Sequence, residues 1–352
     1  MISFPHIHLF HNVLAYVEHV NTDPEVPKQY RIDKPVTFKG TIKLHGSNCG
    51  VVMDVATGAL QAQSREIDLT PEADYKGFAK FVEANAVGIR GMIRKDVLPK
   101  LTGTIHKVAL YGEWVGAGVV KKTKGVAVSK FTEKHWALFA TFAVIDDDIE
   151  ARNVSDLVMD LPLRHYNNTT YIGNVRQAGN WSITVNFSDS ASIEWAQTEA
   201  ARIIATIEKQ CPYGAIYGLE GAGEGIVWMP TGEFTGREDL YWKFKTDAHS
   251  VVLEPKMVKE RPIVADDVLA AIEDFVTRTV TSNRLEQGLD ALEQQGLKTE
   301  KRNTGKFIQW VVADVERECA LELEDAGLAD TWFQVSAAVT VKARDFFLAA
   351  SA

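Results

Sequence analysis

The sequence predicts an α+β fold in which a sheet-rich first domain is followed by a smaller, all-α second domain. From about Lys34 to Lys245, strand-like apolar runs are separated by glycine turns. After Pro255, glycine becomes sparse and apolar residues recur at helical spacing. We therefore expect two domains, residues 1–250 and residues 251–352.

Six runs in the first domain have the composition of strands: Val36–Leu44, Cys49–Val55, Lys107–Trp114, Trp136–Ile145, Trp181–Asn186 and Gly225–Met229. Ala56-Thr57-Gly58 is a tight-turn signal that predicts a hairpin. Helices are expected at Tyr75–Ala84 and Ala191–Gln210, the second of them behind the good cap residues Asp189 and Ser190.

The second domain shows three stretches with helical spacing of apolar residues. They are Val268, Ile272, Phe275 and Val276, then Phe307, Trp310, Val311 and Val315, and finally Trp332 to Leu348. None of them alternates as a strand would, so this region is expected to be all-helical.

Composition describes an ordinary globular protein, with 46% hydrophobic and 24% charged residues in 352. No run approaches the length of about 20 apolar residues that crosses a bilayer, and we expect no membrane partner. The N-terminus does not resemble a signal peptide. Cys49, Cys211 and Cys319 lack metal-ligand spacing and are expected to be reduced thiols of a cytoplasmic protein, which we expect to be a monomer.

The net charge of −9 argues against nonspecific coating of nucleic acid, but it allows a local basic groove. Five lysines gather between Val120 and Trp136: Lys121, Lys122, Lys124, Lys130 and Lys134. This cluster could follow a polynucleotide backbone, and a solvated loop is the alternative.

Lys43 lies in Lys43-Leu44-His45-Gly46-Ser47-Asn48 and is the candidate nucleophile. A lysine amine attacks phosphorus only when neutral, so nearby cations or burial must lower its pKa from about 10.4. Gly46 permits a close backbone approach or a turn with positive φ. Alone, such a motif is more often an exposed lysine at a strand end.

Lys243 and Lys245 share one face of a strand, where a triphosphate between them would relieve their repulsion and they would lower the pKa of Lys43. Glu224 opens a buried strand and could hold Mg²⁺. Glu113 could accept hydrogen bonds from a ribose. For these charged residues the alternatives are solvent-facing lysines of an edge strand and salt-bridged glutamates.

Arg65 follows a strand-like run and could bind phosphate with two hydrogen bonds. His45 lies beside the nucleophile and could contact a phosphate. Phe139 and Phe142 lie in one strand, where an outward-facing aromatic could stack on adenine, although most such residues belong to the core.

Each of these short motifs is weak evidence when taken alone. Their order along the chain supports the interpretation that follows. Lys43-x-His45-Gly46-x-Asn48, Ser64-Arg65, Gly112-Glu113, the segment around Phe142, Glu224-Gly225-x-Val227 and Lys243-x-Lys245 resemble the ordered motifs of covalent nucleotidyltransferases. The histidine in the first motif makes the chain similar to the RNA ligase 2 branch, over roughly residues 30–250. One departure is Phe142-Ala143, where the family often has Phe-Asp, and Phe139 remains a competitor for the stacking position.

The resemblance implies an antiparallel-sheet, ATP-grasp-like nucleotidyltransferase domain. It also implies that Lys43 forms a phosphoramidate with AMP. The other implied roles are nucleotide binding by His45, Gly46, Asn48, Arg65 and Glu113, base stacking by Phe142, metal-assisted chemistry at Glu224, and phosphate stabilisation by Lys243 and Lys245. The implied cofactors are ATP and Mg²⁺, with Mn²⁺ as a substitute.

The favoured function is an ATP-dependent RNA ligase that joins 3′-OH and 5′-phosphate ends of RNA, in a nicked duplex or at splinted ends. A ligase that acts on DNA or on mixed substrates is one alternative. A nucleotide- or RNA-binding module without turnover is another, from a different class.

Overall fold

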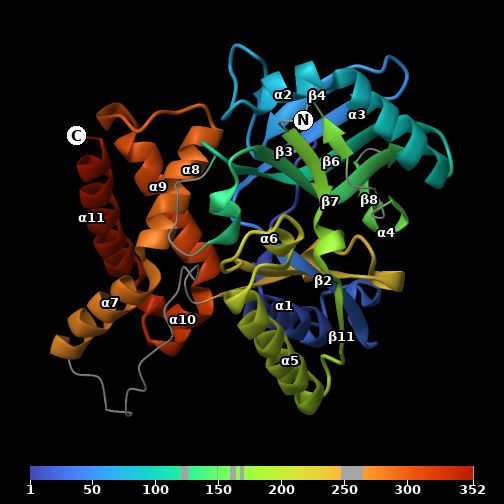
Figure 1. The fold of residues 1–352 in the computed structure, drawn as a ribbon. Coiled ribbons are helices and arrows are strands. Elements are labelled where there is room, and N and C mark those ends of the chain that lie inside the picture. The colour runs from blue at the N-terminus through green and yellow to red at the C-terminus, as the bar shows by residue number, and fades with distance from the viewer. Residues whose placement is uncertain (120–125, 149, 159–163, 167–169, 247–264, 352) are drawn as a thin grey trace. The chain divides into compact units, whose positions relative to one another are not determined.

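The computed structural model describes residues 1–119, 126–148, 150–158, 164–166, 170–246 and 265–351. The chain divides into two compact units, Met1–Thr246 and Asp247–Ala352. The first is built on two mainly antiparallel sheets and the second is helical, which confirms the predicted α+β class (Figure 1). The predicted boundary at residues 250 and 251 lies outside the described residues and stays a prediction.

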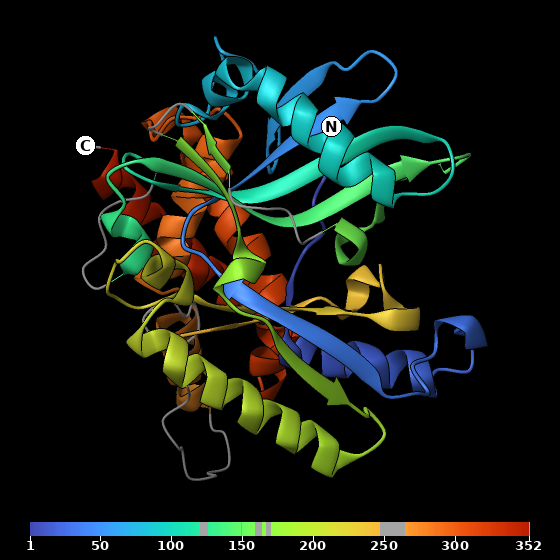
Figure 2. The ribbon, with the colours of Figure 1, turned by 45° about the vertical axis from the view of Figure 1, so that its right-hand side comes forward.

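The first sheet has five strands in the order β1 (His8–Leu9), β13 (Trp242–Lys245), β12 (Gly225–Pro230), β2 (Val36–Lys43) and β11 (Trp181–Val185). All its pairs are antiparallel except β1 with β13. Helices α1 (Phe10–Thr22) and α5 (Ser190–Lys209) cover its outer face, as Figures 1 and 2 show. This packing buries Phe38, Ile42 and Trp228, so the alternate residues of β2 and β12 face the other way.

The second sheet has eight strands: β5 (Asp68–Leu69), β4 (Leu60–Ser64), β3 (Ser47–Asp54), β6 (Ile105–Gly116), β7 (Lys134–Ile145), β10 (Thr170–Asn174) and β9 (Arg164–Tyr166) in that order, with β8 (Arg152–Asn153) paired to β7. Helices α2 (Phe78–Ala84) and α3 (Ala86–Met92) pack on its outer face against residues such as Trp114 and Trp136. Its other face carries a separate aromatic cluster that includes Phe4, Tyr111 and Phe142.

A β-bulge in β7 changes which side chains reach this inner face. Tyr111 pairs with Ala140 and the next residue, Gly112, pairs with Leu138, so Phe139 is the extra residue of β7. Phe139 and Phe142 are three apart and would point to opposite faces of a regular strand. With the bulge between them, both contact Phe4 on the inner face.

The helical unit contains α7 (Ala265–Thr279), α8 (Ser282–Gln294), α9 (Thr304–Glu318), α10 (Ala320–Asp325) and α11 (Trp332–Ala350). Its core includes Phe275, Phe307 and Phe347, which are fully buried. Arg284 is buried among them and pairs with Asp314 at 2.5 Å, so its charge has a partner. Among the described residues, no helix combines the length and the apolar character that crossing a membrane requires.

The six predicted strands and the hairpin after β3 are confirmed, with ends shifted by no more than two residues. Asp189 caps α5 by accepting a hydrogen bond from the Ala191 amide at 3.0 Å. The helix predicted at Tyr75–Ala84 begins later, at Phe78. Helix α1 was not predicted, and its first residue Phe10 packs on Trp242 of the first sheet.

Candidate active site

Lys43 is the last residue of β2 and lies against a buried carboxylate. Its Nζ is 2.7 Å from Oε1 of Glu224, whose side chain is 5% exposed. Glu224 directly precedes β12, where Gly225 pairs with Lys43 across the sheet. The sheet register therefore brings together the predicted nucleophile and the predicted metal ligand.

The predicted lysine pair comes from the neighbouring strand β13. Lys245 pairs with Gly225 and Lys243 with Val227, so both lysines lie on the same face of the sheet as Lys43. Lys245 Nζ is 3.8 Å from the same Glu224 oxygen that binds Lys43, and its side chain is 8% exposed. One carboxylate thus faces two ammonium groups.

The close fit around Gly46 explains why a glycine follows the nucleophile. A Cβ at this position would lie 2.5 Å from Val115 Cγ1 and 2.6 Å from the Trp114 carbonyl oxygen. The Gly46 amide donates a hydrogen bond to the Glu113 carboxylate. The glycine therefore serves close approach, one of the two predicted reasons, and it connects the Lys43 loop to β6.

The charges around Lys43 shift its pKa in the direction opposite to the predicted one. Burial by itself opposes the charge on Lys43, but Glu224 and Glu113 outweigh it and raise the pKa of the lysine. The prediction that the lysine pair lowers this pKa is therefore wrong for the ligand-free protein. Lys245 acts on Glu224 instead: burial opposes its ionisation, yet Lys43 and Lys245 hold the pKa of Glu224 at about 2.

The pKa of Glu113 is shifted in the opposite direction from that of Glu224. Its position on β6 places it opposite Asn48 of β3. Burial raises the pKa of Glu113 to about 7, and the positive charge of Lys43 only partly counteracts this. Among the described residues, Glu113 and Glu224 are thus two carboxylates near one lysine with widely separated pKa values.

Arg65 and His45 complete the predicted set at the edge of the site. Arg65 follows β4, is exposed, and its charge reaches both Lys43 and Glu113. His45 lies near enough to Glu224 to contribute to the lowering of its pKa. Asn48 lies on β3 in register with Glu113. Sequence order thus led to one cluster formed by two sheets.

Phe142 does not fit the stacking role that the resemblance implied. Its side chain is 1% exposed and packs edge-on against Phe4 and Tyr111, so neither ring face is open to a base. Phe139, the bulge residue, is only half-buried and packs edge-on against Phe4 with ring centroids 5.0 Å apart. The geometry therefore favours the competitor that the sequence left open.

The first residues of the chain belong to this site, and sequence reasoning missed them. Ile2 exchanges two hydrogen bonds with the buried Gln63 side chain, at 3.2 and 2.5 Å, and its carbonyl accepts one from Tyr111 Oη at 2.7 Å. Further on, His6 Nδ1 lies 3.4 Å from an Arg65 nitrogen. The aromatic and histidine pattern of residues 4–11 was the available signal.

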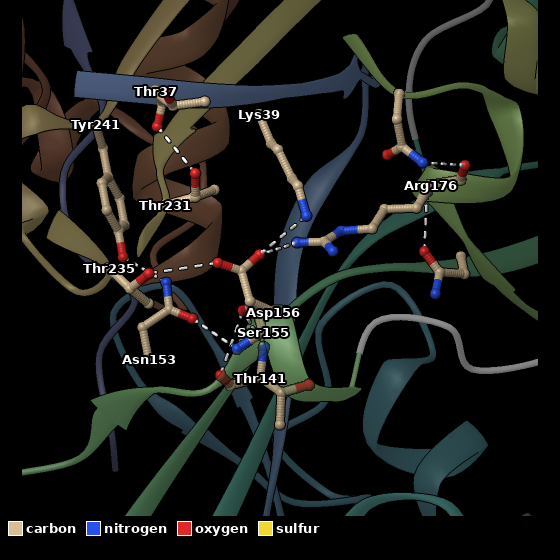
Figure 3. A network of polar contacts seen from close by, with 12 residues as sticks. Thr37, Lys39, Thr141, Asn153, Ser155, Asp156, Arg176, Thr231, Thr235 and Tyr241 are labelled. Carbon is tan, nitrogen blue, oxygen red and sulfur yellow. Dashed lines mark hydrogen bonds and ion pairs between the residues drawn. The ribbon is translucent and has the colours of Figure 1, made fainter. Parts of the chain in front are cut away.

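A polar network around Asp156, which joins residues of the two sheets, was also missed. Asp156, in the short helix α4 (Ser155–Val158), is 3.1 Å from Arg176 and 4.0 Å from Lys39 Nζ. Thr235 Oγ1 donates to its second oxygen at 3.4 Å. Figure 3 shows Lys39 and Arg176 meeting at this carboxylate.

The residues near Lys43 include one buried carboxylate, Glu224, that could help to hold a divalent cation. Within the described ranges, no group of three or more histidine, cysteine or acidic residues has metal-binding geometry. Mg²⁺ is commonly held by one or two carboxylates together with substrate phosphates, and the buried Glu224 fits that mode.

Two parts of the predicted basic cluster have different outcomes. Lys121, Lys122 and Lys124 lie outside the described residues. Lys130 binds the Glu220 carbonyl and Lys134 binds the Lys76 carbonyl, at 2.5 and 2.6 Å. These two contacts are internal to the first unit, and the polynucleotide role of the cluster stays a prediction.

Comparison with known proteins agrees with this geometry. The model of the RNA ligase family matches residues 37–245, from the strand of Lys43 to Lys245. No curated protein matches. Structures of Naegleria gruberi RNA ligase are similar: a variant with AMP and manganese (16% identity, TM-score 0.39), a ligand-free variant of the R4a ligase (16%, 0.41) and a variant with ATP and manganese (16%, 0.41). Each match covers 70% of this chain, and the chain spans 56 to 57% of the Naegleria chains.

The family model covers more than half of the length of this chain. The chain therefore belongs to the RNA ligase family.

Proposed function

We propose that this protein is an ATP-dependent RNA ligase that works through a lysyl-AMP intermediate. The observation that carries the proposal is the convergence of Lys43, Glu224, Lys245 and Glu113 in one cluster of charges in the family-matched region. A lone lysine beside one acid is a common ion pair. A lysine near two unlike carboxylates and further cations is typical of a site for an anionic substrate.

The first reaction is transfer of AMP from ATP to Lys43. The Nζ–phosphorus bond forms while the bond between the α-phosphorus and pyrophosphate breaks, and the amine gives up its proton. Lys243 and Lys245 neutralise charge on the phosphates, which is the largest contribution a protein makes to such a transfer. Mg²⁺, or Mn²⁺ in its place, would be held at Glu224 with the phosphates and would neutralise further charge.

The second and third reactions build the new phosphodiester. AMP moves from Lys43 to the 5′-phosphate of a polynucleotide, and the lysine is released. The 3′-OH of the adjoining end then attacks that 5′-phosphate, and AMP leaves. We assign ribose and phosphate binding to Glu113 and Arg65, and nucleotide binding also to His45, Gly46 and Asn48; their proximity to Lys43 and to one another supports this assignment.

The proposed substrate is RNA with both ends held together, at a nick in a duplex or by a splint. We extend the proposal to the helical unit, which would contact the polynucleotide. Three exposed lysines, Lys298, Lys301 and Lys306, surround the start of α9, and among the described residues none has an ion-pair partner. Arg302 adds a fourth cation there and pairs with Glu300 at 2.8 Å.

The test is covalent labelling with α-³²P ATP and Mg²⁺, followed by denaturing electrophoresis. Wild type should carry label, and Lys43→Ala should carry none. Lys34→Ala is the matched control, because Lys34 lies just before β2 and forms an ion pair with the surface residue Glu233. Absence of label in wild type, after removal of any AMP already attached, would favour the binding-module alternative.

A second assay decides between RNA and DNA. Nicked duplexes that differ only in RNA or DNA at the 3′-OH side should be sealed at different rates, with the RNA end faster. A strong preference for the DNA end would replace the RNA ligase proposal by the DNA ligase alternative.

A further inference from the structure

Residues 2–9, the N-terminal segment, run from the second sheet to the first (Figure 1). The first residue of the segment exchanges two hydrogen bonds with the Gln63 side chain of β4. At the other end, Leu9 of β1 pairs with Lys243 of β13. Gln63 lies two residues before Arg65, and Lys243 belongs to the lysine pair of the site. The N-terminal segment is therefore fastened to two strands that carry cations of the Lys43 site.

Arg65 is an exposed cation that the N-terminal segment contacts. It follows β4 in a turn where the Ser64 hydroxyl accepts hydrogen bonds from the amides of Glu66 and Ile67, at 3.3 and 3.2 Å. In the part of the chain that the structure describes, Arg65 has no ion-pair partner. Its Nη2 lies 3.4 Å from Nδ1 of His6. A long exposed side chain has many rotamers, so it binds an anion more tightly when a neighbouring group orders it first.

The chemistry of this contact determines which partner donates. A guanidinium has five N–H donors and no acceptor, so Nδ1 of His6 must accept, and the proton of the neutral ring must lie on Nε2. The imidazole therefore orients Arg65 without neutralising it. A carboxylate in the same place would also orient the guanidinium, but it would cancel the charge that attracts a phosphate. With a neutral partner, Arg65 keeps its full charge for an anion.

His6 is itself held in place on both sides along the chain. Its half-buried ring packs on the ring of His8, with centroids 5.0 Å apart. The His8 amide donates a hydrogen bond to the Tyr241 carbonyl at 2.9 Å. On the other side, Pro5 restricts the backbone and Phe4 is buried in the aromatic cluster of the second sheet. The imidazole can thus serve as a fixed support for a more exposed side chain.

We propose that His6 is a positioning residue that holds Arg65 in the orientation in which Arg65 binds phosphate. The proposal rests on the proposed function, in which Arg65 holds phosphate, and it adds the group that orients this arginine. His6 acts through Arg65 and touches no reacting atom. Ordering the guanidinium before the substrate arrives removes part of the entropic cost of binding and of alignment. Loss of His6 should therefore slow AMP transfer to Lys43 only as far as it disorders Arg65.

The experiment measures the single-turnover rate constant of covalent labelling at subsaturating ATP, for wild type, His6→Ala, His6→Asn and His6→Gln. Oδ1 of asparagine takes the place of Nδ1, whereas the side-chain oxygen of glutamine lies nearer the place of Nε2. The alanine and glutamine variants should lose about three- to tenfold, the range for one hydrogen bond, and the asparagine variant less than about twofold. His19→Ala, at an exposed position of α1, should keep the wild-type rate constant. Equal losses in the asparagine and glutamine variants would overturn the proposal.

A double-variant comparison separates positioning from a structural role. An unfolded fraction lowers the amplitude of labelling but leaves this rate constant unchanged. In the Arg65→Ala background, adding His6→Ala should change the rate constant by less than about twofold, because the group that His6 orients is gone. A full second loss in that background, or no loss in His6→Ala alone, would overturn the proposal. Failure of the proposed function is seen separately, since wild type would then take no label from ATP.

Discussion

Replacement of Glu113 by glutamine should stabilise the protein at alkaline pH while damaging its proposed activity. Burial raises the pKa of Glu113 from 4.5 to about 7, so the folded protein keeps a proton that the unfolded chain loses. As pH rises from 4.5 to 7 the unfolded state binds fewer protons, and the free energy of unfolding falls. Glutamine keeps the shape of the neutral acid and removes this cost.

The magnitude follows from the two pKa values. At about 1.4 kcal/mol per pKa unit, the raised pKa of Glu113 lowers the free energy of unfolding by about 3 kcal/mol at pH 8 and by about 1 kcal/mol at pH 5. The gain from Glu113→Gln should therefore be larger at pH 8. For a unit of this size, about 2 kcal/mol more stabilisation corresponds to an additional rise in Tm of roughly 4 to 8 °C.

The assay is thermal unfolding of wild type and Glu113→Gln at pH 5 and pH 8, followed by circular dichroism. Glu18→Gln, on the exposed side of α1, is the control and should change Tm little at either pH. An equal gain at both pH values, or a larger one at pH 5, would refute the reasoning. The same variant should label poorly with ATP, because a nucleotide-site carboxylate is kept for function at a cost in stability.

Two further predictions concern Phe139 and the helical unit. Phe139→Leu should raise KM for ATP about tenfold, the worth of one stacked base, whereas Phe142→Leu should leave KM unchanged and lower Tm; a KM effect confined to Phe142 would restore the original assignment. Replacing Lys298, Lys301 and Lys306 together by alanine should spare Lys43 labelling and weaken binding of a nicked RNA duplex. The slope of log affinity against log salt should fall by about 2 to 3, and an unchanged slope would place the polynucleotide elsewhere.

The sequence correctly predicted those features of the site that depend only on local pattern. Strand alternation places Lys243 and Lys245 on one face, and hairpin signals place β3 beside β4, as the structure confirms. The motif residues Lys43 and Glu224 meet because β2 and β12 are neighbours in the sheet, a pairing over a long sequence separation that no local pattern specifies. Only the order of the motifs, read as a family resemblance, anticipated that meeting.

The features that sequence reasoning missed depend on contacts between segments that are far apart in the sequence. Phe142 and Phe139 both reach the inner face because one extra residue of β7 lies between their positions, and both rings contact Phe4 there. Phe142 packs on Tyr111 as well. Phe4 itself comes from a segment that carries no motif. Asp156 lies in a region without landmarks, and its role depends on two cations from β2 and from the turn at Arg176.

The electrostatics of Lys43 show why holding a nucleophile and activating it are separate tasks. Glu224 is the nearest carboxylate to Lys43 and favours its ammonium form, which cannot attack phosphorus. With a pKa of about 2, Glu224 is also too weak a base to remove that proton. The ion pair thus positions the amine and keeps it inactive.

Activation must then come from a change in what surrounds the pair. Any cation that engages Glu224 weakens the interaction that raises the pKa of Lys43, while Lys245 remains 3.8 Å from the same oxygen and adds repulsion. The free amine therefore forms most readily after the substrate and its counterions have filled the site. Under the proposed mechanism, Lys43 would stay charged until ATP is in place, and Glu224, which holds the ammonium form, would make formation of the free amine depend on the substrate.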